Sequence, residues 1–225
     1  MMATPEDIDD FALGFSLSEG LIDDADGIRA SSACRTADGI ELAIELAPEA
    51  FGRFLRRRRA RSLRGHTSCG ICGIEDIAQL RCMAPRGRVD TCGSPVDHDA
   101  IGRAVAGLRD FQPLSRTTHC AHAAAWADGA GRLVLVREDV GRHNALDKLI
   151  GACLRATIAT TGGFCLVTSR CSFEMVQKAV ASRFPALVAV SSPTALAIRT
   201  ARQAGLTLIT LDRGNRPVIH SDRSE

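Results

Sequence analysis

The sequence has 225 residues, of which 45% are hydrophobic, and this is enough for one large domain or two small ones. A formal net charge of +2 argues against a chain built as a whole to bind a polyanion, so we expect no nucleic-acid partner. No apolar run reaches the length of a membrane span, and the polar, acidic first residues lead us to expect no signal peptide. The cysteines number nine and show no disulfide framework, so we expect a cytoplasmic protein without membrane association.

The first residues predict a helix. Thr4 suits its cap, Pro5 suits its first position, and acidic residues follow in the first turn. Gly20 suits its end. Between them, apolar residues recur at helical spacing, at Ile8, Phe11, Ala12 and Phe15.

A hairpin and an arginine-rich segment come next. Residues 40–46 alternate apolar and polar side chains, which predicts a half-buried strand, and residues 28–35 are its expected partner across the Asp38-Gly39 turn. Residues 51–64 then hold seven arginines around a narrow apolar stripe. We favour a surface helix there, with nucleic-acid binding and docking of an acidic partner as the alternatives.

Two thiols follow, in Thr67-Ser-Cys69-Gly-Ile-Cys72-Gly73. The glycines permit positive φ and leave the sulfur atoms accessible, and the preceding arginines favour the thiolate. A Cys-x-x-Cys pair supports half of a zinc site, a dithiol–disulfide cycle or a nucleophilic thiolate. Two inert buried cysteines are the alternative. The stretch from residue 83 to residue 95 is rich in Gly, Pro and Arg and predicts a loop between two halves of the chain.

From about residue 97, helices alternate with strands. A helix is expected around residues 101–108, and two strands, 121–127 and 133–136, flank a Gly-rich turn. Three strand-to-helix junctions follow, after the strands at 133–136, 164–167 and 187–190, and the last core strand is 206–211. This alternation predicts a mainly parallel sheet.

In such a sheet, the strand-to-helix turns share one edge, and ligands bind there. Helix N-termini attract anions, and arginine strengthens the attraction for phosphate. A phosphate-bearing nucleotide is therefore expected, although neither common phosphate loop is present. Taken individually, Ser172 and Ser192 are expected to be ordinary helix caps. The polar residues predicted at this edge are Arg142, His143, Asn144, Ser169, Arg170, Ser172, Ser192 and Thr194.

His119 and His122 flank Cys120, so a metal site is conceivable there. On a strand, however, a His-x-x-His pair places the two rings on opposite faces. We therefore expect these histidines to have core or surface roles and predict no metal site.

Four blocks resemble one family, the formate dehydrogenase accessory sulfurtransferases (FdhD/NarQ-like sulfur carrier proteins). The resemblance covers almost the whole chain. The most specific block is Arg137-Glu-Asp-Val-Gly-Arg-His-Asn-Ala-Leu-Asp-Lys-Leu-Ile-Gly151. The others are the Cys-x-x-Cys block, Ser172-Phe-Glu-Met-Val-Gln-Lys-Ala179 and Ser192-Pro-Thr-Ala-Leu-Ala197.

The resemblance implies a function, partners and site residues. Such proteins accept sulfur from a cysteine desulfurase as a persulfide and pass it to the molybdenum of a bis(molybdopterin guanine dinucleotide) cofactor, which then enters formate dehydrogenase. By this resemblance the protein is a sulfurtransferase and a cytoplasmic homodimer. Cys69 and Cys72 are then catalytic, GDP is an analogue of the bound substrate, and the cofactor-binding residues include Leu211, Asp212, Arg213, Gly214, Asn215 and Arg216.

The resemblance also implies an α/β fold in two parts. Residues 97–225 are expected to form a cytidine-deaminase-like α/β/α domain, and residues 1–96 a smaller N-terminal α+β region that ends in the Cys-x-x-Cys loop. Members usually have a further strand region before the first helix, so this smaller part is expected to be shortened. Two other functions stay open: a cofactor-binding chaperone with structural thiols, and a zinc-binding interaction module.

Overall fold

The computed structural model describes residues 1–58, 89 and 96–221. The predicted thiol pair, Cys69 and Cys72, lies outside these residues. The described helices and strands are α1 (Ile8–Ser18), β1 (Ile28–Thr36), β2 (Gly39–Leu46), α2 (Pro48–Arg58), α4 (His98–Leu108), α5 (Pro113–Thr118), β3 (His122–Asp128), β4 (Leu133–Asp139), α6 (Arg142–Arg155), β5 (Gly163–Val167), α7 (Phe173–Ala181), β6 (Ala186–Ala189), α8 (Ala195–Ala204), β7 (Thr207–Leu211) and β8 (Pro217–Ser221), with short 3-10 turns at Ala25–Gly27 and Arg109–Phe111.

Helix α1 confirms the first predicted helix but not its start. It begins at Ile8, after Asp7 in the left-handed region with φ of 54°. The predicted cap at Thr4 is therefore wrong, because this residue bonds across to Asp139 and Val140 instead. The end is as expected, since Gly20 adopts a positive φ of 65°.

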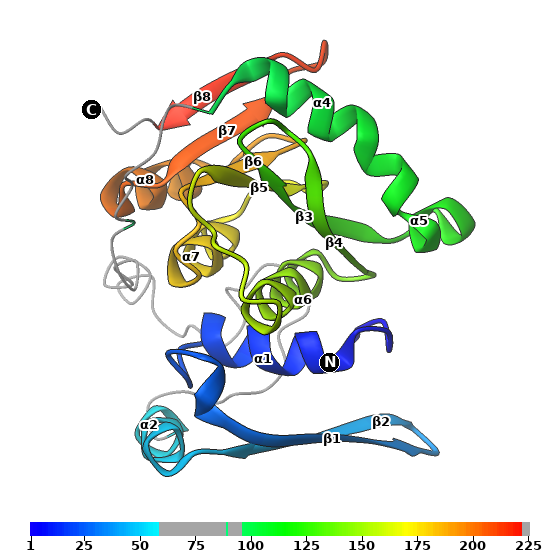
Figure 1. Cartoon of the computed structure of the whole chain (residues 1–225), viewed down its shortest axis with the longest axis vertical. Coiled ribbons are helices and arrows are strands. Elements are labelled where there is room, and N and C mark those ends of the chain that lie inside the picture. The colour runs from blue at the N-terminus through cyan, green and yellow to red at the C-terminus, as the bar shows by residue number, and fades with distance from the viewer. Residues whose placement is uncertain (59–88, 90–95, 222–225) are drawn as a thin grey trace.

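The predicted hairpin is confirmed by the antiparallel pair β1–β2, which forms a separate two-stranded sheet. The apolar residues of β2 are half-buried at Leu42, Ile44 and Leu46. Helix α2 follows, and its Arg53 is held by Asp23 at 2.7 Å and by the carbonyl of Leu21. At least this first arginine of the arginine-rich segment thus has a local partner. Figure 1 places the hairpin and α2 at the end of the molecule opposite β7 and β8.

The second sheet has six strands in the order β4-β3-β5-β6-β7-β8. The prediction that it is mainly parallel is wrong, because among its described strands only β5–β6 and β6–β7 pair in parallel, while the other three pairs are antiparallel. The physical reason is that two connections in this part of the chain are short. Tight turns at residues 129–132 and 212–216 join β3 to β4 and β7 to β8, and a tight turn can join only antiparallel neighbours. Even so, β4, β5, β6 and β7 all point the same way, so their carboxyl ends share one edge.

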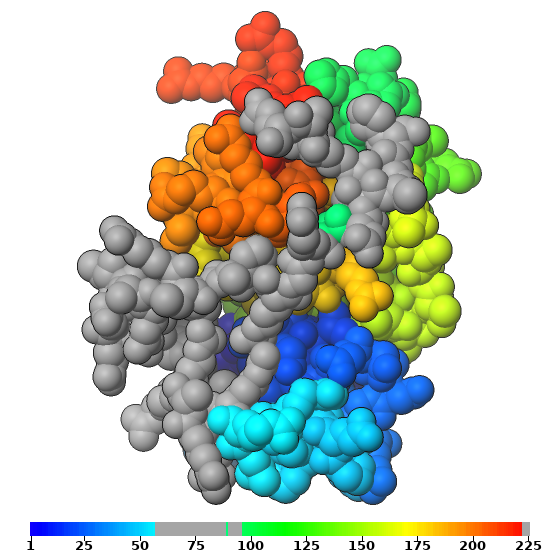
Figure 2. Space-filling model, turned by 90° about the vertical axis from the view of Figure 1, so that its left-hand side faces the viewer, coloured from blue at the N-terminus to red at the C-terminus, as the bar shows by residue number. Residues whose placement is uncertain are grey.

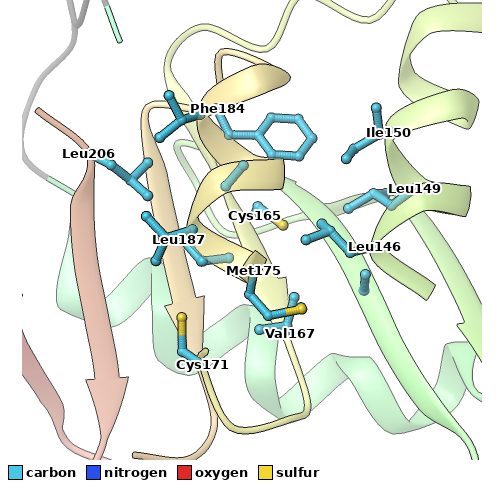
Figure 3. Close-up of a cluster of buried hydrophobic side chains, with 14 of the residues drawn as sticks. Leu146, Leu149, Ile150, Cys165, Val167, Cys171, Met175, Phe184, Leu187 and Leu206 are labelled. Carbon is cyan, nitrogen blue, oxygen red and sulfur yellow. The ribbon is translucent and has the colours of Figure 1, made fainter. Parts of the chain in front are cut away.

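Helices cover both faces of the six-stranded sheet, as expected for an α/β/α arrangement (Figure 1). Side chains alternate along each strand: Phe164 and Leu166 of β5 face the cluster that includes α4, while Cys165 and Val167 face the cluster that includes α6, α7 and α8. Figure 3 shows the second cluster, in which Cys165 and Cys171 lie among aliphatic side chains and Phe184. Burial of this apolar surface on both faces is the main force that holds the layers together.

Helix α1 packs on α6 at unusually close range. A Cβ atom added to Gly14 would lie 1.7 Å from the carbonyl oxygen of Asp147, and one added to Gly151 would lie 1.9 Å from that of Asp10. The contact is also polar and buried. Asp147 accepts hydrogen bonds from Ser18 at 2.6 Å and from Lys178 of α7 at 2.9 Å. The first helix therefore joins the core of the large sheet, and the predicted division into residues 1–96 and 97–225 stays a prediction.

Figure 2 shows the same arrangement from the side, with the N-terminal residues in blue and cyan below and the C-terminal strands in red above. Within the described part of the chain, no helix combines the length and the apolar character that a membrane crossing requires.

Candidate functional site at the carboxyl edge of the six-stranded sheet

We call the carboxyl ends of β4, β5, β6 and β7, with the turns that follow them, the carboxyl edge. The register aligns these ends, because Asp139 pairs with His122, Val167 with Ala124 and Ala189, and Ala189 with Thr210. Every described residue of the predicted cofactor site lies on one of these turns. Arg142, His143 and Asn144 begin α6, Arg170 lies between β5 and α7, and residues 211–216 join β7 to β8.

The turn between β4 and α6 is fixed by a buried carboxylate. Asp139 is fully buried and lies 2.7 Å from the ammonium group of Lys148, which is equally buried. Its other oxygen accepts hydrogen bonds from the backbone N–H of Gly141 at 2.8 Å and from the side-chain amide of Asn144 at 3.0 Å. The amide of Asn144 also donates to the carbonyl of Met2. Asn144, which was predicted to bind the cofactor, thus points inward and supports the turn that carries Arg142 and His143.

The N-terminal segment completes this turn. Thr4 donates its backbone N–H to Asp139, accepts a hydrogen bond from the N–H of Val140 and accepts another from Lys148 through its carbonyl. The segment at residues 2–4 therefore crosses directly over the β4–α6 turn. Sequence patterns could not reveal this contact, since 135 positions separate Thr4 from Asp139.

Three ionisable side chains gather beside Arg142. The ring of His143 lies 3.0 Å from the carboxylate of Glu174, and both side chains are largely buried. Burial and the charges of Arg142 and His143 hold the pKa of His122 below its ordinary value. Our expectation gave His122 a core or surface role. The structure places it near these two residues, because β3 starts at the edge where β4 ends, and its expected role stays a prediction.

The helix N-termini at the carboxyl edge differ in capping. Thr194 caps α8 by accepting a hydrogen bond from Ala197 at 3.1 Å. Gly141, which precedes α6, has no side chain to do so, and Ser172 before α7 makes no capping hydrogen bond. The expectation that Ser172 and Ser192 are ordinary caps is therefore wrong, since Ser172 makes no capping hydrogen bond and Thr194 rather than Ser192 caps α8. The first N–H groups of α6 and α7 have no such side-chain cap, and they contribute positive potential at this edge.

The turn between β7 and β8 is held by its own side chains. Asp212 accepts hydrogen bonds from the backbone N–H groups of Gly214 and Arg216, and its second oxygen lies 2.7 Å from the Arg216 guanidinium. These bonds lower the pKa of Asp212. Arg213 is exposed on the same turn. A matching turn at the opposite edge has the same contacts, with Asp128 bound to Arg132 and to the N–H of Ala130. This turn at the opposite edge provides a control for substitutions in the β7–β8 turn.

The described cysteines fall into two groups. Cys34 and Cys120 are exposed, whereas Cys153, Cys165 and Cys171 are buried. Burial raises the pKa of Cys153 and of Cys171 to about 12, and it raises that of Cys165 as well. The three buried thiols are therefore poor nucleophiles. Among the described residues, no three His, Cys, Asp or Glu side chains are grouped so that they could hold a metal ion.

The model of the FdhD/NarQ family matches residues 1–225. The chain belongs to the FdhD/NarQ family. A relative from Xanthomonas euvesicatoria pv. vesicatoria, named sulfur carrier protein FdhD, is 49% identical over 221 residues, which cover 98% of this chain and 77% of the relative. A protein of the same name from Bordetella parapertussis is 47% identical over 222 residues, which cover 98% of this chain and 78% of that one.

A solved structure also has this fold. The crystal structure of a protein from Desulfotalea psychrophila, described as a formate dehydrogenase accessory protein, matches with a TM-score of 0.71 at 24% identity. The match covers 99% of this chain and 80% of that one. The family resemblance found in the sequence is thereby confirmed, and the mixed α/β architecture is shared with a solved structure.

Proposed function

We propose that this protein is a sulfurtransferase that takes persulfide sulfur from a cysteine desulfurase on Cys69, with the assistance of Cys72. It then transfers this sulfur to the molybdenum of a bis(molybdopterin guanine dinucleotide) cofactor destined for formate dehydrogenase. The observation that carries the proposal is the match of the whole chain to a family whose curated relatives are named sulfur carriers. The buried thiols support it by contrast, since their raised pKa values exclude Cys153 and Cys171 as efficient carriers.

The cofactor is the substrate, and we propose that its guanine nucleotide portion binds at the carboxyl edge. The N-termini of α6 and α7 lack side-chain caps and lie at this edge, where helix N-termini attract anionic groups. Arg142, Arg170 and Arg213 stand on three separate turns of this edge, where guanidinium groups can contact phosphate oxygens. The backbone of residues 211–216 is fixed by Asp212 and would bind with little loss of conformational freedom.

Several further features complete the proposal. We place the protein in the cytoplasm as a homodimer, with a cysteine desulfurase and formate dehydrogenase as its protein partners. The larger part is proposed to have a cytidine-deaminase-like fold. Each of these follows from the family resemblance.

Mass spectrometry tests the sulfur-transfer step. After incubation with a cysteine desulfurase and cysteine, we expect a mass increase of one sulfur atom on the peptide that contains Cys69. The variant Cys69→Ala should lose it, while Cys120→Ala, which removes an exposed thiol elsewhere, should retain it. Normal maturation of formate dehydrogenase by Cys69→Ala would contradict the assignment. A protein that binds GDP but never acquires sulfur would be a cofactor chaperone.

Calorimetry tests the nucleotide site separately. A charge-assisted hydrogen bond to phosphate contributes about 1.5–3 kcal/mol, so Arg142→Ala and Arg213→Ala should each weaken GDP binding roughly tenfold or more. Arg132→Ala is the matched control, because Arg132 occupies a similar turn at the opposite edge. Wild-type affinity in both edge variants would remove these two arginines from the site.

A further inference from the structure

Helix α2 presents an exposed apolar face. Phe51 and Leu55 lie one helical turn apart and are 50% and 43% exposed. The opposite face is fixed to the protein, because Ala50 is buried and Phe54 packs against the core cluster that includes α6, α7 and α8. Single exposed apolar side chains are common on protein surfaces. Two neighbours on one firmly held helix face instead indicate a surface that meets a partner.

Positive charge borders this apolar face. Arg56 is exposed, and its guanidinium group lies beside Gly52, where an added Cβ atom would be 3.6 Å from Nη1. Arg53, by contrast, is paired with Asp23 at 2.7 Å. Residues 51–64 include seven arginines and no acidic residue, although the whole chain has a net charge of only +2. Such a local excess of positive charge attracts an acidic surface and speeds its association.

The apolar pair favours a protein over a nucleic acid as the acidic partner. Proteins bind single-stranded nucleic acids through phosphate contacts and through aromatic rings on which bases stack. Leu55 offers no such ring, and the ring of Phe51 is already stacked on that of Phe54, with 6.2 Å between the centroids. Apolar anchors at positions i and i+4 are typical of a helix face that meets another protein.

We propose that Phe51, Leu55 and Arg56 form the docking surface for the protein that donates sulfur to Cys69, and that this donor meets α2 with an acidic surface around an apolar side chain. The inference rests on the proposed function, which requires a cysteine desulfurase to approach that thiol. Cys69 follows Arg58, the last residue of α2, by 11 positions. A chain spans at most about 3.6 Å per residue, so the covalent link alone keeps this thiol within about 40 Å of the docking surface.

The docking surface serves the approach of the donor rather than the chemistry of transfer. In the transfer itself, the thiolate of Cys69 attacks the outer sulfur of the donor's persulfide. A new S–S bond forms on Cys69, the S–S bond of the donor breaks, and the donor's cysteine leaves as a thiolate, so no oxidant or reductant is consumed. A small persulfide can react in the same way without docking.

Calorimetry with a purified cysteine desulfurase tests the docking surface. Removal of an interface anchor typically weakens binding about tenfold or more, so Phe51→Ala and Arg56→Glu should each lower the affinity by at least that factor. The matched controls are Phe111→Ala and Arg109→Glu, because Phe111 is 53% exposed, Arg109 is also exposed, and both lie in the 3-10 turn after α4. Both controls should bind as the wild type does. Wild-type affinity in Phe51→Ala and Arg56→Glu would overturn the inference.

Sodium polysulfide separates docking from the reactivity of the thiol. It should load Cys69 at the same rate in the wild type, Phe51→Ala and Arg56→Glu, as measured by peptide mass spectrometry. Loading by the desulfurase, at a concentration below its Kd, should be about tenfold slower in the two variants. Equal slowing with both donors would show that the substitutions act on the thiol rather than on docking, and would overturn the inference.

Other occupants of this face give different results. If affinity for the desulfurase is unchanged and Phe51→Ala alters the oligomeric state in analytical ultracentrifugation, the face joins two copies of the chain. If that affinity is unchanged and Arg56→Glu abolishes binding to duplex DNA, the face binds nucleic acid. Either result overturns the inference. If the wild type accepts sulfur from neither donor, the carrier role fails, while the affinities still decide the docking. If polysulfide loads Cys69 but the desulfurase does not bind, the docking inference fails alone.

Discussion

At the scale of single residues, the buried thiols are expected to react slowly with alkylating reagents. A thiol with a pKa of about 12, as burial produces at Cys153 and Cys171, is ionised only to about one part in ten thousand at pH 8. Brief treatment of the native protein with iodoacetamide at pH 8 should therefore modify Cys34 and Cys120 but leave Cys153, Cys165 and Cys171 unmodified. Peptide mass spectrometry measures this, and the same reagent in 6 M guanidinium should modify all five. Rapid native labelling of Cys171 would show that the edge opens far more than its packing suggests.

His122 is the residue through which pH should act. Because burial and the charges of Arg142 and His143 lower its pKa, the neutral ring is favoured in the folded protein, and its contribution to stability is complete above about pH 6.5. That contribution is lost as the pH falls through the lowered pKa. A bound anion favours the protonated ring, so the affinity for GDP should increase as the pH is lowered from 7.5 to 5.5.

The ionisation of GDP itself also changes over this range, so the comparison must be made with a variant. We expect the rise in affinity to be smaller in His122→Gln than in the wild type, as measured by calorimetry at both pH values. The charge of Asp139 acts in the opposite direction and raises the pKa of His122. An equal rise in both proteins would show that His122 does not sense the ligand.

At the scale of elements, the crossing of α1 and α6 depends on two glycines. A methyl group at Gly14 or Gly151 would collide with a backbone carbonyl, which cannot move aside without displacing its helix. Gly14→Ala and Gly151→Ala should each lower the free energy of unfolding by roughly 3 kcal/mol or more. Denaturant unfolding followed by circular dichroism measures this.

The control for these variants is Gly102→Ala. Gly102 lies within α4, and a Cβ atom added there would have no neighbour within 4 Å. Alanine favours a helix over glycine, so this variant should be more stable by about 0.5–1 kcal/mol. Equal destabilisation at all three positions would mean that the close crossing has no special role.

The N-terminal segment should act on the carboxyl edge through Thr4. Replacement by valine keeps the shape but removes the hydroxyl that accepts from the N–H of Val140, at a cost of about 1 kcal/mol. We expect faster hydrogen exchange at Val140 and weaker GDP binding in Thr4→Val. The control Thr36→Val removes a hydroxyl that bonds within the distant β1–β2 hairpin and should change neither. Unchanged exchange at Val140 in Thr4→Val would show that the segment does not support the turn.

At the scale of the whole molecule, sequence patterns predicted the features that depend on neighbouring residues, namely the hairpin and the strand-to-helix junctions. The alternation at residues 40–46 gave the hairpin, and the junctions after β4, β5 and β6 gave one shared edge that carries Arg142 and Arg170. The antiparallel direction of β3 and the presence of β8 were not predicted. Both depend on tight turns, at residues 129–132 and 212–216, and the alternation of strands and helices suggested parallel neighbours instead. Contacts over long separations, such as those of Thr4 and Glu174 with α6 and its preceding turn, left no local pattern at all.

The pairing of α1 with α6 also has a consequence in time. Ser18 meets Asp147 across 129 positions. Ribosomes add about 5–20 residues per second, so the first helix waits on the order of ten seconds before its partner has been made. A helix of 11 residues is marginal in water by itself. During synthesis, its apolar face therefore stays available to chaperones and proteases until α6 emerges, and nascent chains that stop before residue 142 should be rapidly degraded.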